Sequence, residues 1–411
     1  MAALRRLSFL ALLLATTSGY AQDIAVRGQT IHTSAGETID NGIIVIRDGK
    51  ITAVGPAASV SLPDGIRVVE ATVVTPGLID AHTVVGLAGA LNQPHDQDQL
   101  ERSEAIQPEL RALDAYNSRE VLIDWLRDFG ITTIHTGHAP GEIISGQTLI
   151  AKTYGDTVEE AVIVPAKMIA ATLGESAFPD PQGGRKSPGT RGKAAAMLRS
   201  ELAAARNYVD ALEAASEDGD AEPPDRDLRK EALAKVLAGS MPLLVTANRH
   251  QDIMTALRIA SEFDIEIVLD GAAEAYLLVD EIRDAGIPVI LHPTMARAYG
   301  ERENMSLATA GNLISAGIPV AMQSGYETYV PKTRVVLFEA GQALPYGLTF
   351  DQALATITIG AARILGIDDR VGSIETGKDG DLALFDGDPF EYTTHSTGTI
   401  IDGRLVSETV R

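Results

Sequence analysis

The middle of the chain alternates short apolar, β-branched runs with longer amphipathic stretches, and this alternation constrains the fold most strongly. Buried strands are predicted at residues 131–134, 162–164, 243–245, 265–269, 287–291 and 318–322. Helices are predicted at residues 119–129, 193–214, 252–263 and 274–285. Strands that alternate with helices indicate a parallel sheet, and six or seven such units fit a closed α/β barrel better than a sandwich.

Both ends of the chain have a different pattern, in which short apolar runs alternate with turns. In the N-terminal part Asp48-Gly49-Lys50 separates two such runs, which is typical of a hairpin. The C-terminal part repeats this style before Asp402-Gly403. We therefore expect a composite β-sandwich domain of residues 22–74 plus 376–411, with the barrel at residues 75–375 between its two halves.

The first residues have the three parts of a secretory signal. Arg5 and Arg6 precede an apolar run from residue 7 to 15, and Gly19 and Ala21 stand at the −3 and −1 positions of a cleavage site. The alternative, a buried first helix, is disfavoured because all three parts occur together. Residues 1–21 are thus predicted to be a signal peptide, and the mature protein to be periplasmic or secreted.

Composition and motifs exclude several classes of protein. The net charge of −22 argues against nucleic acid and anionic lipid as partners. The sequence has no Cys, no Gly-x-Ser-x-Gly elbow and no phosphate-binding loop of the Gly-x4-Gly-Lys-Ser/Thr type. No stretch after the signal is long and apolar enough to span a membrane. The expected partner is a small-molecule substrate.

Two terminal motifs resemble the amidohydrolase superfamily. Residues 73–82, Val-Val-Thr-Pro-Gly-Leu-Ile-Asp-Ala-His, are similar to its first barrel strand, and residues 372–382 to its return into the β domain. Residues 242–253 and 270–296 resemble the imidazolonepropionase-like branch, and the likeness runs from residue 23 to 405. It implies a TIM-like (β/α)8 barrel with a small β-sandwich domain. It also implies metal-assisted hydrolysis of an amide-type carbon–nitrogen bond, in which divalent ions, zinc first among them, lower the pKa of a bound water.

The family's metal ligands are only partly present at the matching positions. The His-x-His of the first strand is His82 and Val84 here, and the His of the sixth strand is Asp270. The Asp of the eighth strand, which accepts the proton of the water, is Gly325. A Gly-Glu pair resembles another ligand position at Glu175. The resemblance thus implies one divalent ion held by His82, Glu175 and Asp270, or none.

Other polar residues at predicted strand ends are candidates for the remaining roles. His135 and His138 follow the second strand and, with Asp270, are the candidates for proton transfer. They converge only if the strand ends near Thr136 and the loop turns back. Glu327 is a further candidate that would have to reach back into the site. The candidate substrate-binding residues occupy the same predicted face and comprise His95, Gln147, Thr246, Asn248 and His292.

Two functions fit this pattern. The first is an exported hydrolase of non-peptide carbon–nitrogen bonds, in a cyclic amide or a small dipeptide-like substrate, with an altered metal site. The second is an inactive relative that keeps the pocket to bind a small molecule or a protein, in which each His simply bonds to a loop backbone. The loss of ligands at Val84, Thr246, Asp270 and Gly325 favours the second function. The resemblance also leaves a homo-oligomer open.

Overall fold

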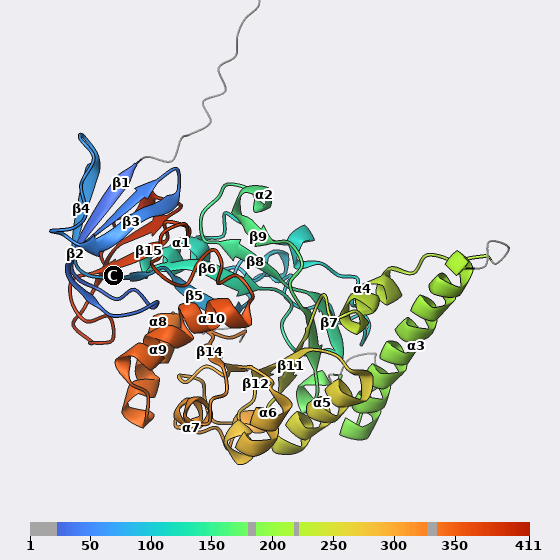
Figure 1. Ribbon diagram of the computed structural model, residues 1–411. Helices are drawn as coiled ribbons and strands as arrows, with labels where there is room; N and C mark the ends of the chain where they lie inside the picture. Colours follow the sequence, from blue (N-terminus) through green and yellow to red (C-terminus); the bar gives the residue numbers. More distant parts are fainter. Residues whose placement is uncertain (1–22, 180–185, 218–221, 327–334) are drawn as a thin grey trace, which may run out of the picture.

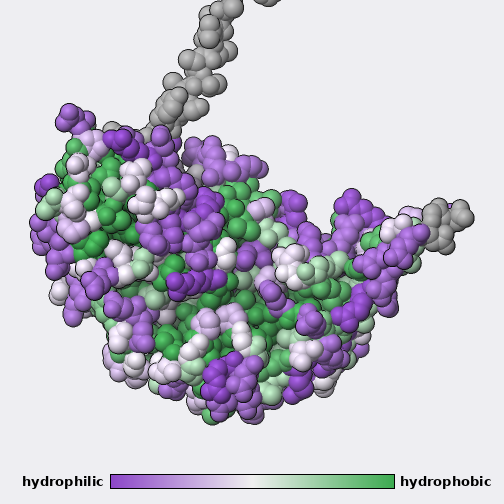
Figure 2. Space-filling view, in the orientation of Figure 1, coloured by the Kyte–Doolittle hydropathy of each residue, from purple (hydrophilic) through white to green (hydrophobic). Residues whose placement is uncertain are grey.

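The computed structural model describes residues 23–179, 186–217, 222–326 and 335–411. The predicted signal peptide and Glu327 lie outside these ranges. A β-rich body built from both ends of the chain lies beside a larger α/β body, from which the long helix α3 (Arg191–Glu217) projects (Figure 1). Figure 2 shows the same projection in a space-filling view. None of the described helices is long and apolar enough to cross a membrane.

The β-rich body is a single seven-stranded sheet in the order β17-β16-β15-β4-β1-β2-β3. Strand β4 pairs in parallel with β1 and antiparallel with β15, and thereby joins the two chain ends edge to edge. The predicted composite domain is present, but its strands form one continuous sheet rather than two separate ones, and residues from both chain ends share one apolar cluster. The strands are β1 (Ile24–Ile31), β2 (Ile39–Arg47), β3 (Lys50–Pro56), β4 (Arg67–Pro76), β15 (Leu382–Phe385), β16 (Ser396–Ile401) and β17 (Arg404–Ser407).

The α/β body contains two further sheets, in the orders β14-β13-β12-β11-β10-β7 and β5-β6-β8-β9. The parallel pairing from β10 to β14 confirms the predicted alternation of strands and helices. The strands are β5 (Leu78–Thr83), β6 (Ile131–Thr136), β7 (Ile144–Gln147), β8 (Leu149–Lys152), β9 (Val162–Val164), β10 (Ile169–Thr172), β11 (Leu243–Ala247), β12 (Ile267–Gly271), β13 (Val289–Leu291) and β14 (Val320–Met322).

These two sheets abut at two places, without forming the single closed parallel sheet that was expected. Thr83 and Gly325 form a parallel bridge between β5 and the end of β14. On the other side, the Thr148 amide donates to the Met168 carbonyl over 2.8 Å, and the Lys167 amide donates to the Thr148 carbonyl over the same distance. The cause of the difference is β7 and β8, which run antiparallel to β10 and β6 in place of a parallel strand.

The α-helices cover the outer face of these sheets, and their apolar sides form the largest buried cluster of the protein. Helices α8 to α10 instead lie beside β5 and β14. The remaining helices are α1 (Val121–Asp128), α2 (Val158–Ala161), α4 (Leu228–Leu237), α5 (His250–Phe263), α6 (Val279–Ala285), α7 (Thr309–Ser315), α8 (Val336–Ala343), α9 (Phe350–Thr356) and α10 (Ile359–Ile364).

The passage from one body to the other depends on Gly77, between β4 and β5. Its amide donates to the Asp381 carbonyl over 2.8 Å, and a β-carbon there would collide with the buried side chain of Thr132. We expect Gly77→Ala to lower the free energy of unfolding by about 1–3 kcal/mol, because overpacking forces its neighbours to shift. Gly36→Ala is the matched control, since nothing lies within 4 Å of its added methyl group. Equal urea denaturation curves for the two variants would contradict this prediction.

Candidate functional site

The ends of the barrel strands carry a layer of buried polar side chains above an apolar layer. Leu244, Val268, Ile290 and Ala321 belong to one apolar cluster on four neighbouring strands. Because side chains two apart on a strand share a face, the residues two positions later lie directly above them. With the buried polar residues at the ends of the other strands, these form what we call the polar layer: His82, His135, Thr148, Thr172, Thr246, Asp270, His292 and Gln323.

Asp270 is the centre of this layer. Its Oδ1 accepts hydrogen bonds from His82 Nδ1 and Gln323 Nε2, each over 2.8 Å, and its Oδ2 accepts one from the Thr246 hydroxyl over 2.5 Å. Burial favours the neutral acid, but the His82 ring and these hydrogen bonds outweigh it and hold the pKa of Asp270 below its usual value. The structure thus contains an ionised carboxylate fixed by three donors.

His82 reaches Asp270 because the pairing of β5 with β6 shifts register between Asp80 and Thr83. An ionised carboxylate only accepts, so His82 Nδ1 carries the proton, and in the neutral ring Nε2 is then an acceptor. Within the described ranges Nε2 has no hydrogen-bond partner, although the side chain is only 1% exposed. The His82 ring lies 5.4 Å from the Tyr326 ring and 5.8 Å from the His135 ring, measured between centroids.

Asp80 lies beside this pair. Its Oδ1 accepts from the backbone amides of His82 and Ser324, over 3.3 and 3.0 Å. Burial outweighs these hydrogen bonds and raises the pKa of Asp80 to about 7. Asp80 therefore ties the ends of β5 and β14 together, where the bridge between the two sheets also lies.

His135 is fully engaged by the protein and has no free nitrogen for proton transfer. Its Nδ1 donates to the Ala81 carbonyl, and its Nε2 accepts from the Thr148 hydroxyl, each over 2.7 Å. Burial, together with the repulsion that a second charge beside the His82 ring would meet, lowers the pKa of His135 to about 3. The catalytic role that the sequence suggested for His135 is not supported by this geometry, which makes the residue a support for the His82 ring.

The His138 ring packs against Gly146, whereas the His135 ring binds Thr148, two residues further along the same segment of β7 and β8. The chain does bend after Thr136, where β6 ends, as convergence of the two histidines required. Burial lowers the pKa of His138 to about 4, and neither ring nitrogen has a partner. No contact places His138 against Asp270, so the two do not form the proton-transfer pair that the sequence suggested.

The structure separates the five candidate substrate-binding residues. Thr246 and His292 lie in the polar layer, and the Asn248 side chain is buried beside Gly271, with its Oδ1 unpartnered. Gln147 is instead bound to the loop that contains Pro108, because its Nε2 donates to the Pro108 carbonyl over 2.9 Å. His95 lies exposed in a short 3-10 helix, Pro94–Asp96, away from the buried layer.

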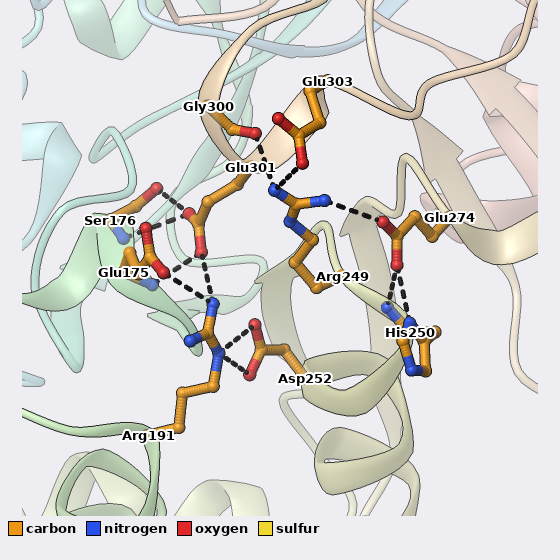
Figure 3. A network of polar contacts seen from close by, with 10 residues as sticks. All are labelled: Glu175, Ser176, Arg191, Arg249, His250, Asp252, Glu274, Gly300, Glu301 and Glu303. Atoms are coloured by element: carbon orange, nitrogen blue, oxygen red, sulfur yellow. Dashed lines mark hydrogen bonds and ion pairs between the residues drawn. The ribbon is translucent and has the colours of Figure 1, made fainter.

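Glu175 belongs to an ion-pair network above the strand ends rather than to the Asp270 cluster (Figure 3). It binds Arg191 over 3.1 Å, and Arg191 also binds Asp252 over 3.0 Å. Glu301 accepts from the amides of residues 175 and 176 and from the Ser176 hydroxyl. The Glu175 side chain is 59% exposed, so the expected metal ligation by Glu175 is not supported. The network instead fastens together the loops that follow β10, β11 and β13.

A neighbouring part of the same network joins Arg249 to the loops after β12 and β13 (Figure 3). Arg249 binds Glu274 over 3.0 Å and Glu303 over 2.8 Å. Although burial opposes it, hydrogen bonds from His250, Asn304 and Arg249 lower the pKa of Glu274 to about 2. His250 is thereby bound to Glu274 through both its backbone amide and its ring Nδ1.

The side chains at the family's ligand positions do not fit a metal ion. Asp270 is held by three hydrogen bonds, two to Oδ1 and one to Oδ2, and Val84 lies in an apolar cluster. His82 Nε2 is the one free nitrogen donor that this ligand set retains. Among the residues that the structure describes, no group of three or more His, Cys, Asp or Glu could hold a metal ion. The chemistry that these residues can supply is that of a histidine–carboxylate pair.

Sequence reasoning overlooked three members of the polar layer, Gln323, Thr148 and Thr172. Gln323 was visible only as the residue before Ser324-Gly325, and Thr148 lies between two strands that were not predicted. The signal for Gln323 was its position two residues after the apolar Ala321 on a buried strand. For Thr148 no such pattern was available.

Comparison with known proteins shows what this arrangement is similar to. The model of a family described as "Amidohydrolase family" matches residues 191–407. An imidazolonepropionase from Rhizobium rhizogenes is 25% identical over 374 residues, covering 85% of this chain and 87% of that protein. One from Brucella anthropi is 27% identical over 373 residues, with coverage of 85% and 87%.

Solved structures agree on the architecture. The crystal structure of an amidohydrolase from Thermotoga maritima MSB8 has a TM-score of 0.88 and 27% identity, covering 94% of this chain and all of that one. A prolidase complexed with N-methylphosphonate-L-proline has a TM-score of 0.61 at 16% identity, over 94% of this chain and all of that one, which shows the fold alone. The likeness supports a TIM-like barrel with a separate β domain.

Proposed function

The chain belongs to the amidohydrolase family, and from this membership we propose that it is an exported hydrolase of a carbon–nitrogen bond in a small molecule. The substrate class is a cyclic amide or a small dipeptide-like compound. The curated relatives, which carry the name imidazolonepropionase, favour the cyclic amide. The observation that carries the proposal is His82, a buried histidine with Nδ1 fixed by a carboxylate and Nε2 unpartnered.

His82 has the geometry of a general base. Asp270 fixes its ring orientation and the position of its proton, so Nε2 can accept a proton from a water molecule. The Thr246 and Gln323 hydrogen bonds keep the Asp270 carboxylate in place. His135 packs beside the ring and, with both nitrogens engaged, does not compete for that proton. No step is assigned to a metal ion, because the ligand set does not fit one.

A second candidate function is binding without catalysis, which the side chains at the family's ligand positions favour. Val84, Thr246 and Gly325 cannot supply the ligands that the family uses there. The fixed Asp270 carboxylate and the unpartnered nitrogen of His82 could then serve only to hold a ligand. Turnover separates the two functions.

The test is turnover of a panel of cyclic amides and dipeptides by the purified mature protein. We expect at least one cyclic amide to be hydrolysed, and His82→Gln to lower kcat by at least about 10²-fold, because it removes a general base. Glu175→Gln is the control, since Glu175 lies outside the polar layer. Turnover that survives His82→Gln would reject the assigned role. An inactive wild-type protein that still binds panel members would establish the binding function.

A further inference from the structure

The family's central metal position is replaced in this chain by a different kind of centre. We propose that the polar layer is a metal-independent site, which receives the N–H groups of a neutral or cationic small molecule through unpartnered acceptors around the Asp270 carboxylate. This inference rests on the proposed function for the location of the substrate.

The backbone at two positions opposes the return of a metal ligand. Gly325, which stands where the family has its Asp, has a φ of +87°, and an added β-carbon would lie 2.6 Å from Pro293 Cγ. Gly271, directly after Asp270, has a φ of +75°, and an added β-carbon would lie 2.7 Å from Asn248 Oδ1. Both conformations favour glycine, so a side chain at either position would be strained as well as crowded.

The charge at the centre has also changed sign. A divalent cation attracts carbonyl and carboxylate oxygens, whereas the Asp270 carboxylate repels them. The polar layer contains three histidines, three threonines, Asp270 and Gln323. Asp270 is its one acidic residue, and none of its members is a Lys or an Arg. An anionic ligand would find no permanent positive charge in this layer.

The unpartnered buried atoms of the site are acceptors. His292 Nδ1 lies 3.0 Å from the Pro293 carbonyl and must donate to it, which leaves Nε2 as an acceptor, as in His82. Among the described residues, three acceptors of the polar layer have no protein donor, namely His82 Nε2, His292 Nε2 and Gln323 Oε1, and Asn248 Oδ1 and Asp80 Oδ2 beside the layer are likewise unpartnered. Buried acceptors need a donor, which water or a ligand must supply. A lactam, cyclic urea or amine offers such N–H groups.

The first experiment tests metal independence with Co(II) alone. The mature protein is stripped with a chelator, reloaded with Co(II), and studied by absorption spectroscopy and elemental analysis. We expect no ligand-field bands, no stoichiometric metal and an unchanged Tm. Gly325→Asp and Gly325→Ala should lower Tm by similar amounts, and neither should bind Co(II). Stoichiometric Co(II) in the wild-type protein or in Gly325→Asp would overturn the inference, even if the hydrolase function stands.

The second experiment tests the ligand class with two small probes. Imidazolidin-2-one is neutral and carries two N–H groups, and propionate is an anion of similar size. Each is titrated into protein labelled with ¹⁵N in its histidine rings, and the His82 signal is assigned by its loss in His82→Gln. We expect imidazolidin-2-one to shift the His82 Nε2 resonance and propionate to leave it unchanged. A shift with propionate, or none with imidazolidin-2-one, would overturn the inference whether or not the protein turns over a substrate.

Discussion

Replacing Asp270 with alanine is expected to lower the free energy of unfolding by about 3–5 kcal/mol. The substitution leaves three buried donors without an acceptor, namely His82 Nδ1, the Thr246 hydroxyl and Gln323 Nε2. Each abandoned buried donor costs about 1–3 kcal/mol, and the removed side chain leaves a void between them. Urea denaturation of wild-type and variant protein at pH 7 measures the difference.

Asp270→Asn is the matched control for this prediction. The amide keeps the shape of the side chain and one acceptor oxygen for His82 and Gln323, while the Thr246 hydroxyl can rotate to accept from its nitrogen. We expect it to retain most of the stability that Asp270→Ala loses. If the two variants were equally unstable, the carboxylate charge rather than the hydrogen-bond connections would hold the layer together.

The parallel part of the fold could be predicted because its strands are buried on both faces. The runs before Thr246, Asp270 and Gln323 are continuous and apolar, which is typical of a parallel sheet under helices. The predicted first and last residues of the strands were less accurate. Ile265 was assigned to a strand, yet its amide donates to the Ala260 carbonyl at the end of α5. Local pattern shows that an element exists better than it shows where the element begins.

The antiparallel return strand at residues 144–152 could not be predicted in this way. It contains Gly146, Gln147 and Thr148, which interrupt the apolar pattern, and its β7 half pairs with β10, more than twenty residues away along the chain. Its position depends on tertiary contacts, such as that between His135 and Thr148. This strand is the reason that the barrel consists of two abutting sheets.

The candidate site was predictable where a residue's position on a strand fixes its direction. Asp270 and Thr246 lie in the polar layer because they alternate with buried apolar residues. His82 lies in the polar layer because the pairing of β5 with β6 shifts register, and the alternation of residues in the sequence does not predict such a shift. Glu175 and His95 follow strands but lie in loops, whose direction depends on partners far away in the sequence, such as Arg191 for Glu175. Sequence position alone could not separate these two cases.

A buried ion cluster below the strand ends joins the two bodies of the protein and leads to the last prediction. Lys152 of β8 is 5% exposed and binds Asp379 over 2.8 Å, Asp381 over 3.1 Å and Asp402 over 2.5 Å. We expect Lys152→Met to lower the free energy of unfolding by about 3–5 kcal/mol at pH 8, because it leaves the buried Asp381 carboxylate uncompensated, whereas Asp379 keeps Lys50 and Arg370. Met is chosen because it keeps most of the volume of the Lys stem.

The expected deficit depends on pH, and its sign follows from Asp381. Burial raises the pKa of Asp381 to about 6 in the folded protein, although Lys152 opposes the shift, and the unfolded value is near 3.8. A group with a raised folded pKa adds stability as pH falls through that pKa, because the folded state binds the proton first. Without Lys152 this pKa rises further, so the deficit should be largest at pH 8 and shrink toward pH 5.

Lys50→Met is the control that separates charge burial from simple loss of an ion pair. Lys50 binds Asp379 over 2.5 Å, but its side chain is 50% exposed, so its loss is expected to cost under about 1 kcal/mol. Chemical denaturation of the three proteins at pH 5 and pH 8 gives the comparison. A Lys152→Met deficit that is the same at both values would mean that lost packing, and not the unpaired carboxylates, causes it. A deficit that shrinks on acidification would mean that the charge of Lys152 stabilises the junction between the two bodies. Protonation of Asp381 would then remove the negative charge that Lys152 neutralises in the wild-type protein.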